Sequence, residues 1–289
     1  LEILNNLDLS FISKNDHQRL NLVVLFSFEN FDAERVRSAL INAIHNIPKF
    51  RSQLVRKFFS YYWRRVSSDE IHKSVRISHK VYKSEEEFLQ NSKNEVNKYI
   101  DVMNELPYYI ELYKYADSNK GAMLFKFDHV MSDGLGIVLA ICSMADNYDP
   151  HMFPKVMNKP KPSQWLMYIQ NILDNLLFLI YFPIVLYKSL LVKRPITPFK
   201  DHTRPNRNNT IVHISKEYNI DDYKEFRMKH SISFNDLYVS VLSATLSRIC
   251  KEGNFNNVHS FVSFIPIGRT DVPKNIDTVH IENTTSGIN

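Results

Sequence analysis

An irregular mixture of strand-like and helix-like segments over the first 150 residues limits the fold of this chain more than any other feature. Runs rich in β-branched and aromatic residues predict strands at 22–28, 61–66, 75–82, 108–115 and 122–127. Helices are expected after the N-cap Asp32, after a capping box of Ser84 and Glu87 that opens a helix reaching about Ile100, and over the apolar run 134–144. Since strands and helices do not alternate as βαβ units, the sequence predicts mixed α/β (α+β) layers.

The rest of the chain is divided by two polar segments that contain proline, 150–165 and 195–209. Beyond them, strands are expected at 211–215 and 259–265, and helices at 221–230 and 236–250. We therefore expect an N-terminal domain over 1–160, a crossover over 161–209 and the first part of a C-terminal domain over 210–289.

The crossover contains an apolar run, 176–192, whose only charged residue is Lys188. At about 1.5 Å of rise per residue, a helix of this length is shorter than a hydrocarbon core roughly 30 Å thick, and Pro183 is expected to kink it. Nearby tyrosines, tryptophan and basic residues favour a segment that lies at a membrane interface. A buried core helix remains the alternative.

The charge balance restricts the partners. The chain has 36 basic and 31 acidic residues, a formal charge of +5. This small excess does not predict nucleic-acid binding, but it suits an anionic membrane surface or an anionic small substrate. Cys142 and Cys250 lie in apolar runs, so they are expected to be buried and reduced, as in a cytosol-facing protein.

The strongest candidate site is Phe-Lys-Phe-Asp-His-Val-Met-Ser-Asp-Gly over 125–134. Here a strand runs into a turn that holds His129, and Asp133 and Gly134 open a helix. A neutral imidazole is suited to take a proton from an alcohol, Asp133 can fix the turn, and Gly134 allows a ligand to approach the backbone closely. Taken alone, the pattern also fits a partly buried histidine beside an aspartate that only caps a helix.

This segment resembles the His-His-x-x-x-Asp-Gly motif of the wax ester synthase/diacylglycerol acyltransferase family, within the superfamily of CoA-dependent acyltransferases and condensation domains. Flanking segments are similar to family motifs in the same order, at 7–11 with 20–28, 31–54, 106–112, 233–237 and 264–269. In this chain Asp128 replaces the first histidine of the motif, Tyr108 and Tyr109 replace a leucine and a tryptophan, and Arg269 lies one residue early.

The resemblance implies two chloramphenicol-acetyltransferase-like domains around a central tunnel, with the second domain continuing past residue 289. It also implies transfer of a fatty acyl group from acyl-CoA to a long-chain alcohol or diacylglycerol, with His129 as the base. Asn235 is expected to stabilise the oxyanion and Asp133 to orient the turn, although Asn235 also suits a helix N-cap. Gly134, Asp128 and Arg269 are expected near the substrates, and a structural ion pair of Arg269 is an equal alternative.

No metal or cofactor is expected, because acyl-CoA is itself a substrate. The expected location is a cytosol-facing membrane surface, that of the endoplasmic reticulum or a lipid droplet, reached through 176–192. The alternative function is an inactive accessory subunit of a larger assembly, which the change at Asp128 favours. A soluble acetyltransferase or condensation-type domain is disfavoured by the apolar run 176–192.

Overall fold

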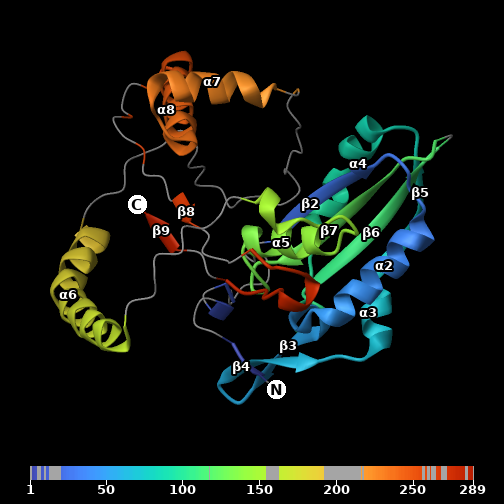
Figure 1. Ribbon diagram of the computed structural model, residues 1–289, viewed down its shortest axis with the longest axis horizontal. Helices are drawn as coiled ribbons and strands as arrows, with labels where there is room; N and C mark the ends of the chain where they lie inside the picture. The colour runs from blue at the N-terminus through green and yellow to red at the C-terminus, as the bar shows by residue number, and fades with distance from the viewer. Residues whose placement is uncertain are drawn as a thin grey trace. The chain divides into compact units, whose positions relative to one another are not determined.

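The computed structural model describes residues 2–4, 8–9, 11–12, 21–116, 118–153, 163–191, 216, 218–255, 258, 261, 265–267, 272–283 and 286–288 (Figure 1). The chain divides into two compact units. The first contains Leu1–Met157, Arg207–His213 and Ile265–Ile288, and the second contains Asn158–Asn206 and Ile214–Phe264.

The first unit holds every described strand. Its strands are β1 (Glu2–Ile3), β2 (Asn21–Phe28), β3 (Ser52–Lys57), β4 (Ser60–Arg65), β5 (Val75–Tyr82), β6 (Tyr108–Tyr115), β7 (Gly121–Asp128), β8 (Ile265–Ile267) and β9 (Ser286–Ile288). Its α-helices are α2 (Ala33–Asn46), α3 (Ser68–Ser74), α4 (Glu85–Asn97) and α5 (Gly134–Ser143), with short 3-10 helices at Pro48–Arg51, Pro150–Met152 and Ile276–Thr278.

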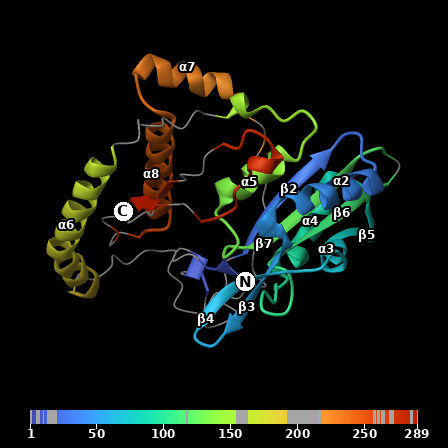
Figure 2. The same ribbon diagram turned by 60° about the horizontal axis from the view of Figure 1, so that its bottom comes forward.

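The main sheet has the order β2-β7-β6-β5, in which only the β5–β6 pair is parallel. A smaller sheet has the order β1-β4-β3, so the β3–β4 hairpin stands apart from the main sheet (Figures 1 and 2). Strand β7 pairs on both sides and all of its 8 residues are buried. A strand buried on both faces reads as a continuous apolar run, as β7 largely does.

The two faces of β7 pack in two different hydrophobic clusters. Met123, Phe125 and Phe127 belong to the cluster that includes Leu40 and Ile44 of α2. Ala122 and Leu124 belong to the cluster that includes Phe88 of α4. This separation follows from the two-residue period of a strand, and it leaves β7 held by packing on both faces.

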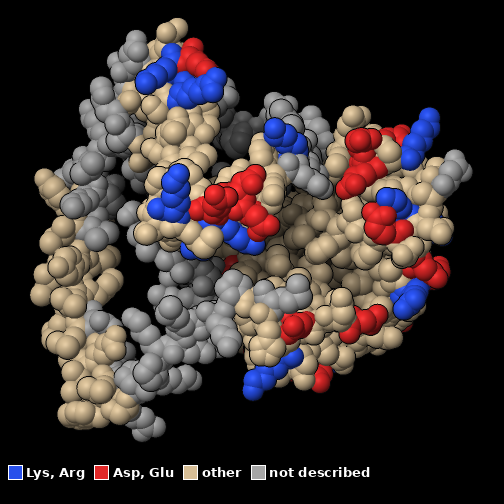
Figure 3. Space-filling model, turned by 45° about the horizontal axis from the view of Figure 1, so that its top comes forward, with Lys and Arg blue, Asp and Glu red and all other residues tan. Residues whose placement is uncertain are grey.

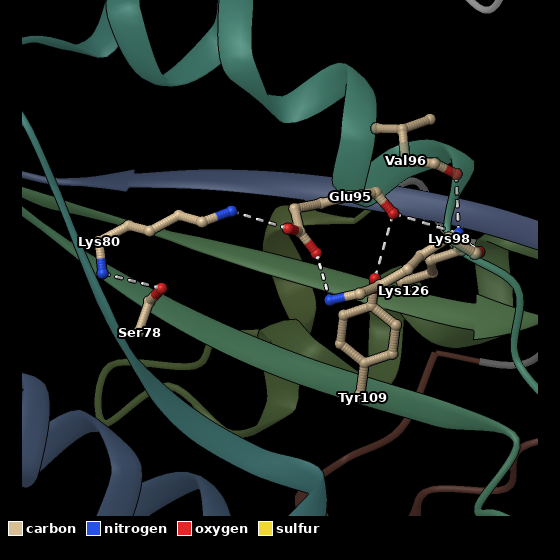
Figure 4. Close-up of polar contacts among 7 residues, drawn as sticks. All are labelled: Ser78, Lys80, Glu95, Val96, Lys98, Tyr109 and Lys126. Atoms are coloured by element: carbon tan, nitrogen blue, oxygen red, sulfur yellow. Dashed lines mark hydrogen bonds and ion pairs between the residues drawn. The ribbon is translucent and has the colours of Figure 1, made fainter. Parts of the chain in front are cut away.

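Lys126 interrupts the apolar run of β7, and its side chain ends on α4 (Figure 4). Its side chain is fully buried, and Nζ donates to the carbonyl oxygens of Val96 at 2.7 Å, Glu95 at 3.3 Å and Lys98. The last carbonyls of a helix have no partner within the helix and carry partial negative charge. Lys126 therefore ties the C-terminal end of α4 to the central strand.

The carboxylate of Glu95 holds two lysines at the same end of α4. Its oxygens lie 3.1 Å from Lys80 Nζ and 2.8 Å from Lys98 Nζ. Burial alone would raise the pKa of the Glu95 carboxyl, but the hydrogen bonds from Lys98 and Lys80 outweigh this effect and lower it.

We predict that Lys126→Met lowers the free energy of unfolding by about 2 kcal/mol, because buried carbonyl oxygens of α4 lose a charged donor. Urea unfolding followed by circular dichroism measures the change. The matched control is Lys120→Met, which removes an exposed ion pair with Glu29 and is expected to cost less than about 1 kcal/mol. Equal stability losses in the two variants would contradict the assigned role of Lys126.

The regular elements described in the second unit are all helices: α6 (Gln164–Leu191), α7 (Ile220–His230) and α8 (Phe234–Glu252). Helix α6 has 28 residues and continues through Pro183 without a break. Its described side chains are uncharged, and its surface is drawn in tan at the left of Figure 3. The large apolar side chains described between Leu176 and Tyr187 are 44–68% exposed. Within the described part of the chain, no helix combines the length and apolar character needed to span a membrane.

The mixed α/β class and most of the predicted elements of the first unit are confirmed. The sequence did not predict β3 or α3, and α4 ends at Asn97 rather than near Ile100. Cys142 and Cys250 are free thiols but only half-buried, which corrects the expectation of full burial. The strand expected at 211–215, and that at 259–265 except for Phe261 and Ile265, lie outside the described residues.

Candidate functional site

His129 is the first residue after β7, and Asp128 makes three hydrogen bonds, two of which close the turn that holds His129. The backbone N–H of Asp128 donates to the carbonyl of Pro107 at 2.8 Å, and its carbonyl accepts from Met131 N–H at 3.0 Å. Its side-chain Oδ1 accepts from Val130 N–H at 2.9 Å. An aspartate that bonds the backbone two residues ahead stabilises a turn, so Asp128 fixes the direction in which His129 leaves the strand.

The imidazole of His129 stacks on the ring of Phe11, with 3.8 Å between the ring centroids and 17° between the planes. Its Nδ1 atom is buried and has no hydrogen-bond partner among the described residues, although the side chain as a whole is only half-buried. Phe11 thus covers one face of the ring and limits its rotation.

The backbone of His129 is held by a residue from the far end of the chain. Asn283 Nδ2 donates to the carbonyl oxygen of His129 at 2.9 Å and to Asp8 Oδ1 at 2.7 Å. The other oxygen of Asp8, Oδ2, lies 2.7 Å from Lys49 Nζ. A buried ion pair is therefore connected through one amide group to the carbonyl of His129.

The Asp8–Lys49 pair is almost fully removed from water, with 2% and 13% of the two side chains exposed. Burial lowers the pKa of the Lys49 ammonium, and the Asp8 carboxylate opposes that shift. The ammonium also lies 5.1 Å from the centroid of the Trp63 ring. Asp8 thus provides the main compensation for a buried positive charge.

A cavity of about 210 Å³ adjoins this ion pair. Polar groups from three separate parts of the chain line it, among them Glu2, Asp8, Lys49, Ser52, His280 and Glu282. No group of three or more potential metal ligands occurs among the described residues.

Asp133 is the N-cap of α5, since its Oδ1 accepts from Gly136 N–H at 2.9 Å. This is the capping role that the sequence left open for Asp133. A Cβ atom at Gly134 would meet nothing within 4 Å, whereas one at Gly136 would lie 2.5 Å from Ser132 Oγ. Local packing therefore requires glycine at position 136, and the space beside Gly134 is open.

Two other predicted site residues lie in the second unit or outside the described residues. Asn235 is the second residue of α8 in the second unit, it is exposed, and the N-cap of that helix is Ser233. Its oxyanion role stays a prediction. Arg269 lies outside the described residues. The sequence analysis gave no site role to Asp8, Phe11 or Lys49, although they lie in the family-like segments 7–11 and 31–54, and it did not single out Asn283 at all.

We predict that Asp8→Asn lowers the free energy of unfolding by about 3 kcal/mol, because Lys49 becomes a buried charge without its carboxylate. Adding Lys49→Met removes that charge, so the double variant should recover at least half of the loss. Urea unfolding of both single variants and the double variant measures the coupling between the two residues. A double variant as unstable as Asp8→Asn would contradict this account.

No family model matches the sequence, and no curated protein sequence matches it. Solved structures do match. The epimerization domain from the third module of tyrocidine synthetase B superimposes with a TM-score of 0.56 and 16% identity, over 95% of this chain and 64% of that one. SgcC5 from Streptomyces globisporus gives 0.50 and 13%, over 92% of this chain and 60% of that one. This chain therefore spans less than two thirds of the length of either structure.

A wax ester synthase/diacylglycerol acyltransferase from Marinobacter aquaeolei VT8 gives a TM-score of 0.41 and 15% identity, over 63% of this chain and 47% of that one. Superposition at that level does not distinguish one family of this fold from another. The matches show the fold, a mixed α/β fold of the chloramphenicol-acetyltransferase-like type.

Proposed function

We propose that this chain belongs to an acyl-CoA-dependent O-acyltransferase that transfers a fatty acyl group to a long-chain alcohol or diacylglycerol, forming wax ester or triacylglycerol. The observation that carries the proposal is the placement of His129. It follows a buried strand directly, and its turn, its ring face and its carbonyl oxygen are each held by a different residue. Such fixation is what a general base requires, because proton transfer depends on precise geometry.

The proposed reaction needs one proton carrier. Because Nδ1 of His129 is buried, Nε2 is the nitrogen that takes the hydroxyl proton while the alcohol oxygen attacks the thioester carbonyl. The tetrahedral intermediate then collapses, the carbon–sulfur bond breaks, and the same proton passes from Nε2 to the leaving CoA thiolate. Asn235 would donate to the oxyanion and Arg269 would bind the CoA phosphates.

The long apolar surface of α6 supports a location at a lipid surface. The segment 176–192 would lie in the interface of the endoplasmic reticulum or a lipid droplet, where lipid alcohols and acyl-CoA concentrate. The exposure of its apolar side chains favours this arrangement over a buried one.

A non-catalytic accessory subunit is the second candidate, and Asp128, which stands where the family motif has its first histidine, favours it. The open space beside Gly134 favours the enzyme instead, because local packing does not fill the position where a ligand would approach.

We predict that His129→Ala lowers ester formation from palmitoyl-CoA at least 100-fold, since general acid–base groups contribute about 10²–10⁴ in rate. The assay uses the 289-residue chain with liposomes, and with either hexadecanol or diacylglycerol as acceptor. His151→Ala, which changes an exposed histidine, is the matched control and should retain full activity. Folded wild-type protein that forms no ester with either acceptor would refute the proposed activity and support the accessory role.

A further inference from the structure

The β3–β4 hairpin ends in two adjacent aromatic side chains that contact little of the protein. Phe58 is 81% and Phe59 is 97% exposed, and these two residues form the whole loop between Lys57 and Ser60. Full exposure of two neighbouring phenylalanines is unfavourable in water, and it marks a surface that meets another apolar phase.

The base of the hairpin is firmly anchored, which separates it from the tip. Leu54 and Trp63 are paired across the two strands and are 0% and 5% exposed. They pack in one cluster with Val130, the residue after His129. At roughly 3.3 Å per strand residue, the tip lies about 13 Å beyond Leu54, so the hairpin is a fixed arm with an apolar end.

The turn residue itself is unusual. Phe58 has a φ of 55°, in the left-handed region that favours glycine. Two-residue hairpin loops with a positive φ at the first loop position normally hold glycine or asparagine there. Local backbone energy would therefore favour glycine over phenylalanine at position 58, so the aromatic ring needs another explanation.

The hairpin itself carries charge of a single sign, and Glu2 of β1 lies beside its base, opposite Trp63. Residues 52–66 include four basic residues, Arg56, Lys57, Arg64 and Arg65, and no acidic residue. Arg64 donates to Gln53 Oε1, and Arg65 donates to the Pro48 carbonyl and to Ser52. The other two cations, Arg56 and Lys57, precede the tip on β3. Arg56 Cζ lies 5.9 Å from the centroid of the Tyr61 ring, and Lys57 Nζ lies 5.8 Å from that of the Phe58 ring.

We propose that the tip of the β3–β4 hairpin is a membrane-contact site that inserts Phe58 and Phe59 into the interface of an anionic lipid bilayer. Arg56 and Lys57 then lie at the level of the lipid phosphates, where basic residues are attracted to the negative surface. This site is on the first unit, distinct from α6, and it does not depend on the proposed acyl transfer.

Two features favour a bilayer over a nucleic acid. Affinity for a nucleic acid grows with the number of phosphates that cations neutralise, and two of the four cations are already engaged within the hairpin base. In addition, the rings of Phe58 and Phe59 lie at the end of the hairpin, beyond Arg56 and Lys57. An interfacial segment has the same order, with apolar side chains in the hydrocarbon region and basic side chains at the level of the headgroups.

The test is vesicle flotation of the 289-residue chain with phosphatidylcholine alone and with phosphatidylcholine and phosphatidylserine at about 70:30. The variant Phe58→Gly/Phe59→Ser should bind the anionic vesicles at least tenfold less strongly. Because glycine suits the backbone at position 58, its melting temperature should be equal or higher, which separates lost binding from unfolding. Val81→Ser removes a different exposed apolar side chain of the same unit and should change neither property.

Helix α6 could hide the contribution of the hairpin, so the comparison is repeated in a Leu179→Ser/Ile180→Ser background, where a tenfold effect of the hairpin change should persist. In a Phe59→Trp/Trp165→Phe variant, in which the remaining native Trp63 is buried, brominated lipids should quench the new tryptophan only with anionic vesicles. Equal binding by the hairpin variant and wild type would overturn the proposal. The proposal would also be overturned if the wild-type protein bound neither kind of vesicle, or if it bound a single-stranded RNA 20-mer instead of vesicles. A wild-type dimer that the hairpin variant no longer forms would overturn it as well.

Discussion

The burial of β7 on both faces and along both edges is the constraint on which the first unit depends. Hydrogen bonds to β2 and β6 fix its edges, and two hydrophobic clusters fix its faces. Lys126 adds a polar link from this strand to the end of α4. A strand held from four directions determines where its next residue begins, and that residue is His129. The rigidity of the candidate site is thus inherited from the sheet rather than created by the loop.

The site is nevertheless completed by residues that are far away in the sequence. Phe11 covers the imidazole, and Asn283 joins the carbonyl of His129 to the Asp8–Lys49 pair. The segment 272–283 also buries Val279 and Ile281 in the main core and accepts a hydrogen bond from Ser132 at the Glu282 carbonyl. Strand, turn and distant segment thus form one packed body, and residues 279–282 of that segment also line the cavity beside Lys49.

The sequence predicted those parts whose signals are local. Asp32 caps α2 and Ser84 accepts from Glu87 N–H, as their side chains and spacing indicate, and the aromatic runs became β2, β5, β6 and β7. Strand β3 was not predicted because apolar and polar residues alternate too weakly over Ser52–Lys57 to distinguish a strand from a loop. Asn283 could not be predicted, since no short pattern reports a contact across 154 residues. The structural role of Asp128 is visible only in the three-dimensional structure, where its carboxylate accepts a hydrogen bond from Val130 N–H and closes the turn that holds His129.

The long separation between His129 and Asn283 also sets an order of events during synthesis. A ribosome adds roughly 5–20 residues per second, so the turn at His129 emerges on the order of ten seconds before the segment that holds it. During that interval the growing chain can form its sheet, but Asp8 lacks one of its partners and the carbonyl of His129 is unanchored. Contacts of such long range also slow folding, because the closure entropy of the loop must be overcome first. The main sheet of the unit can therefore form before the candidate site is complete, because the site requires Asn283 and the sheet ends at Asp128.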